Sequence, residues 1–67
     1  MAYTLKTEKA IAKYGKEICE KAFKLHEGDG EGARTIGFEF KLTTRQADAA
    51  INAGRELHYA NISDYQK

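Results

Sequence analysis

The residues best equipped for chemistry are one cysteine and two histidines, Cys19, His26 and His58. Cys19 and His26 stand seven residues apart in a stretch with helical periodicity, so they fall on roughly the same side of a helix. A zinc site needs three or four ligands, and nothing in the spacing brings His58 to the other two. A thiol on an apolar helix flank is also poorly activated as a nucleophile. The sequence therefore predicts neither a metal site nor a cysteine nucleophile.

A second candidate is the segment 27–32, in which glycines alternate with acidic residues. Phosphate-binding glycine loops lie between a strand and the N-terminus of a helix, where free backbone amides meet the anion. Here the segment follows a predicted helix, and its three carboxylates would repel phosphate. A calcium loop counted from Glu27 would need a glutamate at its twelfth position, where Phe38 stands. We expect a solvated turn, and we predict that the protein is not an enzyme and needs no cofactor.

The length of 67 residues predicts a single small domain, spanning 1–67. A chain of this size buries only about 60% of its unfolded surface, so its core alone gives marginal stability. The single cysteine permits no internal disulfide, which leaves association with another chain as a source of stability. The lone thiol, the lack of an apolar leader in the first residues and the lack of a membrane-spanning run predict a cytoplasmic protein without membrane contact.

The clearest local pattern lies in residues 35–42, where large apolar side chains occupy every second position: Ile36, Phe38, Phe40 and Leu42. A period of two places such residues on one face of a strand. We predict that this strand is the apolar platform that the other elements cover. A shorter strand is expected over residues 2–5.

Residues 8–26 predict one long helix. Its main apolar stripe recurs at spacings of three and four and consists of Ile11, Tyr14, Ile18, Ala22 and Leu25. A second apolar strip, Ala12, Cys19 and Phe23, falls about 120° away around the helix. Two explanations fit this wide apolar arc. Either the helix sits in a corner between the sheet and a second helix, or the second strip contacts another chain.

The C-terminal part predicts a short helix and a last strand. Thr43 and Gln46 stand at capping-box spacing, so a helix is expected over 44–53, with Gly54 just after its end. Residues 55–62 then predict a strand. The alternative, in which the helix continues through His58 and Ile62, would bring Arg55 onto the apolar side. Together these elements predict an α+β fold, with one long N-terminal helix and a short second helix packed on a small two- or three-stranded sheet.

The net charge of +1, from 11 basic and 10 acidic residues, excludes neither a protein nor a nucleic acid as the partner. In type, though not in motif, the short chain without an active site resembles small accessory proteins of phages and other mobile elements. The resemblance implies a protein-binding module that inhibits or modulates a host protein by covering its surface. We also expect a homodimer, with the strip Ala12, Cys19 and Phe23 as its interface.

Nucleic-acid binding is the alternative function. Residues 42–47 resemble the opening of the first helix of a helix-turn-helix, whose second helix would then have to follow Gly54. Three arginines, together with Tyr3 and Tyr59, could form a basic and aromatic surface. With the apolar strip included, the predicted partner-binding residues are Ala12, Cys19, Phe23, Arg34, Arg45, Arg55 and Tyr59.

Overall fold

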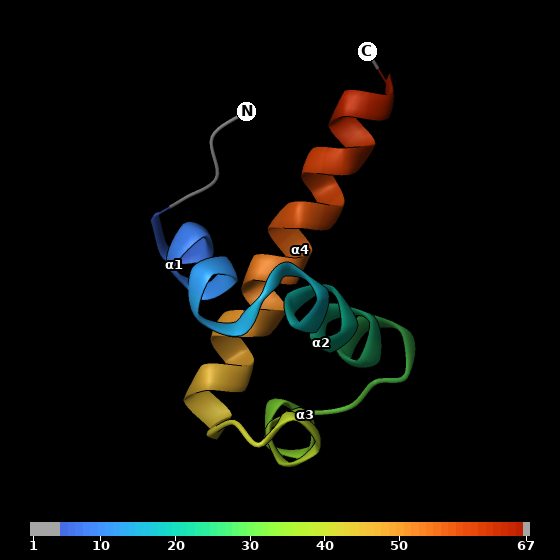
Figure 1. Cartoon of the computed structure of the whole chain (residues 1–67). Helices are drawn as coiled ribbons and strands as arrows, with labels where there is room; N and C mark the ends of the chain where they lie inside the picture. Colours follow the sequence, from blue (N-terminus) through green and yellow to red (C-terminus); the bar gives the residue numbers. More distant parts are fainter. Residues whose placement is uncertain (1–4, 67) are drawn as a thin grey trace.

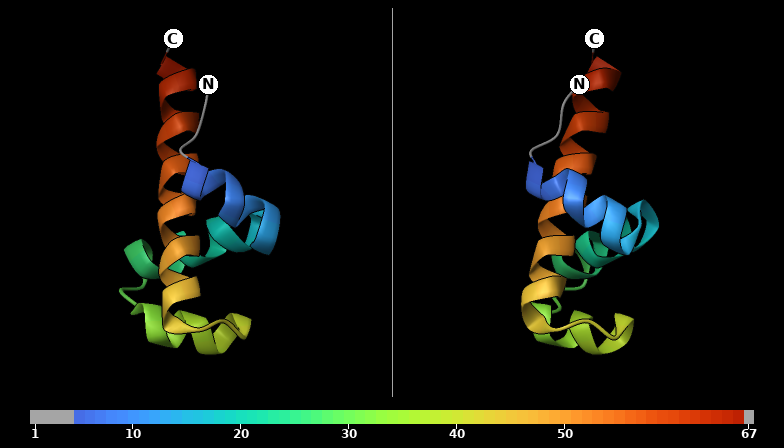
Figure 2. Two further views of the ribbon diagram at one scale, coloured as in Figure 1. Left: turned by 90° about the vertical axis from the view of Figure 1, so that its left-hand side faces the viewer. Right: turned by 60° about the vertical axis from the view of Figure 1, so that its left-hand side comes forward.

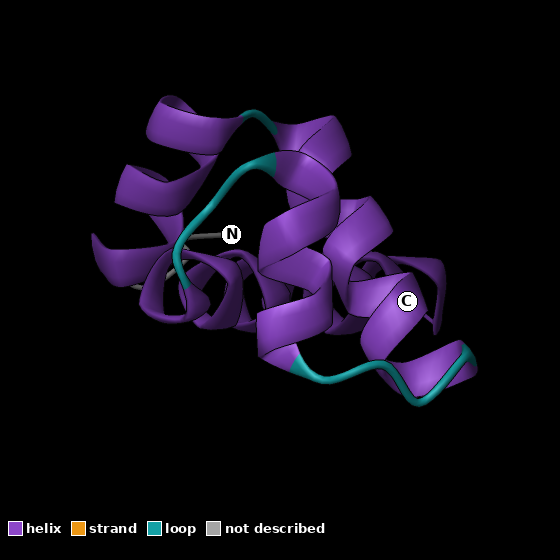
Figure 3. Ribbon diagram, turned by 90° about the horizontal axis from the view of Figure 1, so that it is seen from below, coloured by secondary structure: helices purple, strands orange, loops and turns teal. Residues whose placement is uncertain are grey.

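The computed structural model describes residues 5–66, with side-chain surroundings for residues 5–59. Over this range the chain forms four helices: α1 (Leu5–Tyr14), α2 (Lys16–Gly28), α3 (Ala33–Phe40) and α4 (Thr44–Gln66) (Figure 1). The described residues contain no strand (Figure 3). The predicted α+β fold is therefore wrong, because the part of the chain that the structure describes is all-helical. Residues 2–4 of the predicted first strand lie outside the described residues, and Leu5 begins α1.

Helix α4 is the element on which the other three pack. It is 23 residues long, α1 and α2 contact its middle, and α3 lies across its start (Figure 2). Its last turns extend beyond the other helices (Figure 1). The buried side of α4 consists mostly of small residues, and its members are Ala47, Ala50, Ile51, Ala53, Gly54 and Leu57. Small side chains let three helices approach one axis closely, so the core is built around α4.

The predicted last strand is a continuation of α4. Residues 55–62 are helical, so the helix expected to end at 53 runs on to Gln66. Gly54, predicted to follow the helix end, is buried within it. Arg55 had argued against a continuous helix, yet it is only half-buried and donates a hydrogen bond to Glu27 Oε1 at 3.1 Å. This ion pair with the end of α2 removes the conflict, and the alternative interpretation of a continuous helix is confirmed.

The predicted long N-terminal helix is broken at Gly15. This residue has a φ of +94°, a conformation that glycine adopts without steric cost, and it separates α1 from α2. The two halves of the predicted apolar stripe therefore belong to different helices. In α1 the buried Thr7 donates a hydrogen bond to Glu56 Oε2 at 2.6 Å, which ties α1 to the middle of α4.

The predicted central strand is helix α3 and the turn that follows it. Ile36 is fully buried and Phe40 is half-buried, whereas Phe38 is 78% exposed. Residues four apart share one face of a helix, so Ile36 and Phe40 face the core together while Phe38 points away. The platform of four apolar side chains does not form.

None of the described helices combines the length and the apolar character needed to cross a membrane.

Candidate nucleic-acid interface

Helices α3 and α4 are joined by only three residues, Lys41, Leu42 and Thr43. Lys41 has a left-handed backbone conformation, with φ 59° and ψ 43°, and it is the one non-glycine residue with positive φ in the described part of the chain. The Leu42 amide then donates a hydrogen bond to the carbonyl of Gly37 at 2.7 Å. A left-handed residue at a helix end turns the chain sharply. The turn therefore directs α4 away from α3, which lies across its first turns (Figure 2).

Gly37 allows α3 to rest directly on this turn. A Cβ atom at position 37 would lie 2.6 Å from the carbonyl oxygen of Leu42 and 3.3 Å from that of Thr43. Ile36 and Ala47 are fully buried on the two sides of the turn, and Leu42 is half-buried. Helix, turn and helix consequently pack as one unit.

The start of α4 is stabilised by two reciprocal hydrogen bonds. The Gln46 amide donates to Thr43 Oγ1 at 3.1 Å, and the Thr43 amide donates to Gln46 Oε1 at 3.0 Å. The capping box predicted from the sequence is thereby confirmed. The outer side of the first turns carries exposed residues, which are Thr44, Arg45, Asp48, Ala49 and Asn52.

The exposed start of α4 forms one wall of a groove of about 520 Å³, and α1 forms the other wall. Helix α1 contributes Lys6, Lys9 and Lys13, which recur at spacings of three and four and so share one helix face. The remaining charged residues of the lining are Arg45, Asp48 and Glu56. Four cations therefore face two carboxylates, and we call this site the basic groove.

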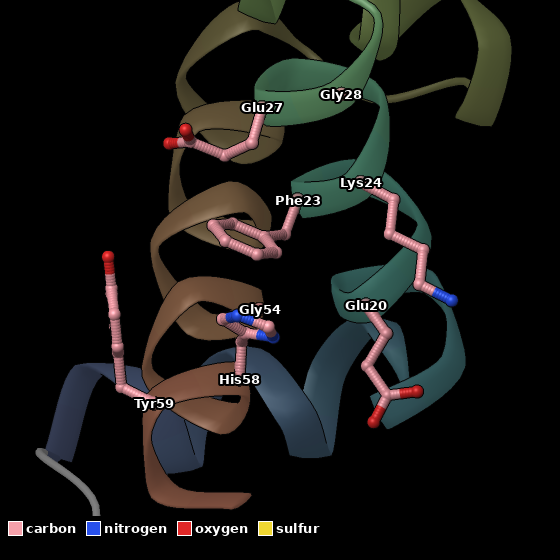
Figure 4. A pocket seen from close by; sticks show the side chains of 8 residues that line it. All are labelled: Glu20, Phe23, Lys24, Glu27, Gly28, Gly54, His58 and Tyr59. Carbon is pink, nitrogen blue, oxygen red and sulfur yellow. The ribbon is translucent and has the colours of Figure 1, made fainter. Parts of the chain in front are cut away.

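A second groove, of about 640 Å³, lies between α2 and α4 and has the opposite balance of charge (Figure 4). The His58 ring contacts the rings of both Phe23 and Tyr59, with centroid distances of 5.2 and 5.6 Å. The charged residues of the lining are Glu20, Lys24 and Glu27. One cation thus accompanies two carboxylates, so this site, which we call the aromatic groove, is a poorer surface for a polyanion than the basic groove.

The predicted partner-binding residues are distributed over several surfaces. Arg45 lines the basic groove, and Phe23 and Tyr59 line the aromatic groove. Arg34 is exposed on α3 and Arg55 is paired with Glu27, and neither lines the basic groove.

The apolar strip expected at a dimer interface is not continuous. The break at Gly15 separates Ala12, which is exposed on α1, from Cys19 and Phe23 on α2. Cys19 is fully buried against α4, and burial raises the pKa of its thiol, with a smaller contribution in the same direction from the Glu20 carboxylate. A buried, protonated thiol is a poor nucleophile. Among the described residues, no three histidine, cysteine or acidic side chains gather as a metal site would require.

The lysines of the basic groove are not among the binding residues predicted from the sequence, although the spacing of Lys6, Lys9 and Lys13 is visible there.

No family model, curated protein or solved structure matches this chain. The candidate interface is therefore assigned from its geometry and charge alone.

Proposed function

We propose that the protein binds double-stranded DNA, with α3 and α4 as a helix-turn-helix. The observation that carries the proposal is the three-residue turn at the left-handed Lys41, packed beneath Gly37, which sets α3 across the start of α4. In this motif the second helix enters the major groove with its N-terminal residues against the base edges, and the first helix crosses the backbone. Residues 42–47, which the sequence placed at the opening of the first helix, here lead into the second.

The side chains at the start of α4 have suitable chemistry for this role. Arg45 can donate two hydrogen bonds to guanine, and Asn52 can pair with adenine through its amide. Both are exposed on the outer side of the helix. A helix with its side chains is about 10–12 Å wide, and the major groove is about 12 Å wide. The capping box supports the proposal further, because it holds the first turn in place without using Arg45.

The test is a binding titration by fluorescence anisotropy with a labelled duplex pool, followed by selection of the preferred sequence. We expect affinity to fall roughly a hundredfold between 50 and 200 mM salt, as for about four phosphate contacts. Arg45→Ala should weaken the preferred duplex by about 1–3 kcal/mol and relax the preference at one base pair. Lys21→Ala, on α2 and outside the basic groove, is the matched control and should leave that preference unchanged.

Two outcomes would overturn the proposal. The first is no duplex binding at 50 mM salt when the protein is at about 10⁻⁴ M, a concentration at which nonspecific binders are occupied. The second is salt-dependent binding to a single strand with none to the duplex, because α4 would then have no major groove to enter.

A second candidate function is binding of a protein through the aromatic groove, in keeping with a module that modulates a host protein or pairs with its own copy. The observation that favours it is the cluster of Phe23, His58 and the 59% exposed Tyr59. Aromatic residues carry much of the binding energy at protein interfaces. Sedimentation equilibrium of the wild type and of Tyr59→Ala tests the case of a second copy. A dimer that Tyr59→Ala leaves intact would contradict it, and a wild-type monomer would restrict this candidate to a different protein.

A further inference from the structure

We infer that Lys6, Lys9 and Lys13 on α1 form a second DNA contact, which binds the phosphate backbone beside the major groove that α4 enters. The inference rests on the proposed function and adds an element that a helix-turn-helix does not itself contain. We call these three residues the lysine row. Their role is to position the duplex, whereas Arg45 contacts the base edges.

The first support is the shared groove. The lysine row and the exposed start of α4 line the same hollow, with Lys6, Lys9 and Lys13 on one wall and Arg45 and Asn52 on the other. A duplex seated on the start of α4 would therefore bring its backbone toward α1. Helix α1 is held at this place by the hydrogen bond from Thr7 to Glu56.

The second support is the spacing of the charges. From Lys6 to Lys13 the row extends about 10 Å along α1, at 1.5 Å per residue. One DNA strand carries a phosphate for about every 3.4 Å of the helix axis, so the row spans about three nucleotides of a single strand. All three lysines are exposed, and among the described residues none of them forms an ion pair.

The third support is the contrast with the lysines of α2. Lys21 forms an ion pair with Glu17 at 3.3 Å, and Lys24 lines the aromatic groove beside Glu20 and Glu27. Lys21 and Lys24 also line a smaller hollow of about 380 Å³, together with Glu39 of α3. The lysines of α1 differ in that they share a groove with the exposed start of α4. Position, and not total charge, distinguishes the lysine row.

The experiment compares two triple variants of the full chain. Lys6→Gln, Lys9→Gln and Lys13→Gln are combined in the test variant, and Lys16→Gln, Lys21→Gln and Lys24→Gln in the control. Each lowers the net charge by three, from +1 to −2. Glutamine and lysine have similar helix propensities, so both variants should fold, which circular dichroism verifies. Affinity for the selected duplex and for a scrambled duplex is measured across salt concentrations.

We expect the test variant to reduce the salt slope by about 2.7, which is 0.9 for each lost phosphate contact, and the control to change it by less than about 1. Both duplexes should lose affinity by the same factor, because phosphate contacts carry no direct sequence information. Lys9→Gln alone should reduce the slope by about 0.9 and serves if the triple variant is unstable.

Three results would overturn the inference, and they are distinguishable. Equal losses in the two triple variants would reduce the effect to overall charge and leave the proposed function standing. A loss confined to the selected duplex would mean that the lysines read bases. A wild-type protein that binds no duplex at all would remove the proposed function and this inference together.

Discussion

Gly54 of α4 lies directly against the backbone of Cys19 in α2. A Cβ atom at position 54 would collide with the carbonyl oxygen of Cys19 and would lie 2.6 Å from the Cβ of Phe23. These neighbours are a backbone atom and the first atom of a side chain, so no change of rotamer can move them aside. The two helices therefore depend on the absence of a side chain at this position.

Gly54→Ala should lower the free energy of unfolding by about 1–3 kcal/mol, because α2 and α4 must separate to admit the methyl group. Gly28→Ala is the matched control, since nothing lies within 4 Å of its added Cβ and the residue is helical. It should be neutral or stabilise by up to about 1 kcal/mol. Urea denaturation measures both, and equal effects at the two positions would contradict the close contact.

Truncation of two apolar residues should change stability to very different extents. Ile51 is 2% exposed within the core, so Ile51→Ala should cost about 2–5 kcal/mol. Phe38 is 78% exposed, so Phe38→Ala should change stability by no more than about 0.5 kcal/mol. Thermal melts followed by circular dichroism give the comparison. A large loss of stability for Phe38→Ala would contradict the helical assignment of α3 and favour the predicted central strand.

Lys41→Gly should stabilise the protein by about 0.5–1 kcal/mol. The left-handed conformation costs an ordinary residue about 1–2 kcal/mol, and glycine avoids this cost while losing more chain entropy on folding. The same substitution at Lys24, within α2, should instead destabilise by about 1 kcal/mol, because glycine is a poor helix former. Denaturant midpoints of the two variants should therefore shift in opposite directions. A shift of the same sign would show that Lys41 bears no backbone strain.

Stability should decline at alkaline pH through Cys19. Burial raises the pKa of this thiol in the folded state, so the folded protein holds its proton more tightly than the unfolded chain does. Its contribution is fully present below the pKa of the unfolded thiol and is lost as pH rises through the folded pKa, at no more than about 1.4 kcal/mol per pH unit. Cys19→Ala controls for lysine and tyrosine ionisation. If the variant and the wild type lose stability equally between pH 8 and 10, the thiol plays no part.

What could be foreseen from the sequence was local. The capping box of Thr43 and Gln46 involves residues three apart, and its hydrogen bonds form as predicted. The ion pair of Glu17 with Lys21, which are four residues apart, is another contact of this local kind. Such pairs form within one helix, so they can be predicted without knowing which distant segments pack against that helix.

The failures arose where packing partners decide the structure. The alternation from Ile36 to Leu42 satisfies a strand, but Ile36 and Phe40 also satisfy one face of a helix, and four positions cannot separate the two periods. Glycine is common just after helix ends, but Gly54 lies inside α4, where it allows close contact with α2. Because α2 is far away in the sequence, this role could not be predicted from the neighbouring residues. Arg55 was judged without its partner Glu27.

The same error shifted the candidate site. With α3 interpreted as a strand, residues 42–47 could only open a first helix, and a recognition helix had to be sought after Gly54. Arg45 was named as a binding residue, but the groove that it lines with Lys6, Lys9 and Lys13 joins helices nearly forty residues apart. Only the folded chain brings those charges together.

The hydrogen bond between Thr7 and Glu56 also has to form late during synthesis of the chain. The two residues are 49 positions apart, so at 5–20 residues per second roughly 2–10 s pass between their incorporation by the ribosome. Helix α1, with only 10 residues, is too short to be stable alone. Among the described helices, α1 is translated before the others, yet its hydrogen bond to α4 forms only after the middle of α4 has been made. Until the middle of α4 emerges from the ribosome, the side of α1 that α4 later covers remains exposed to solvent and to other proteins.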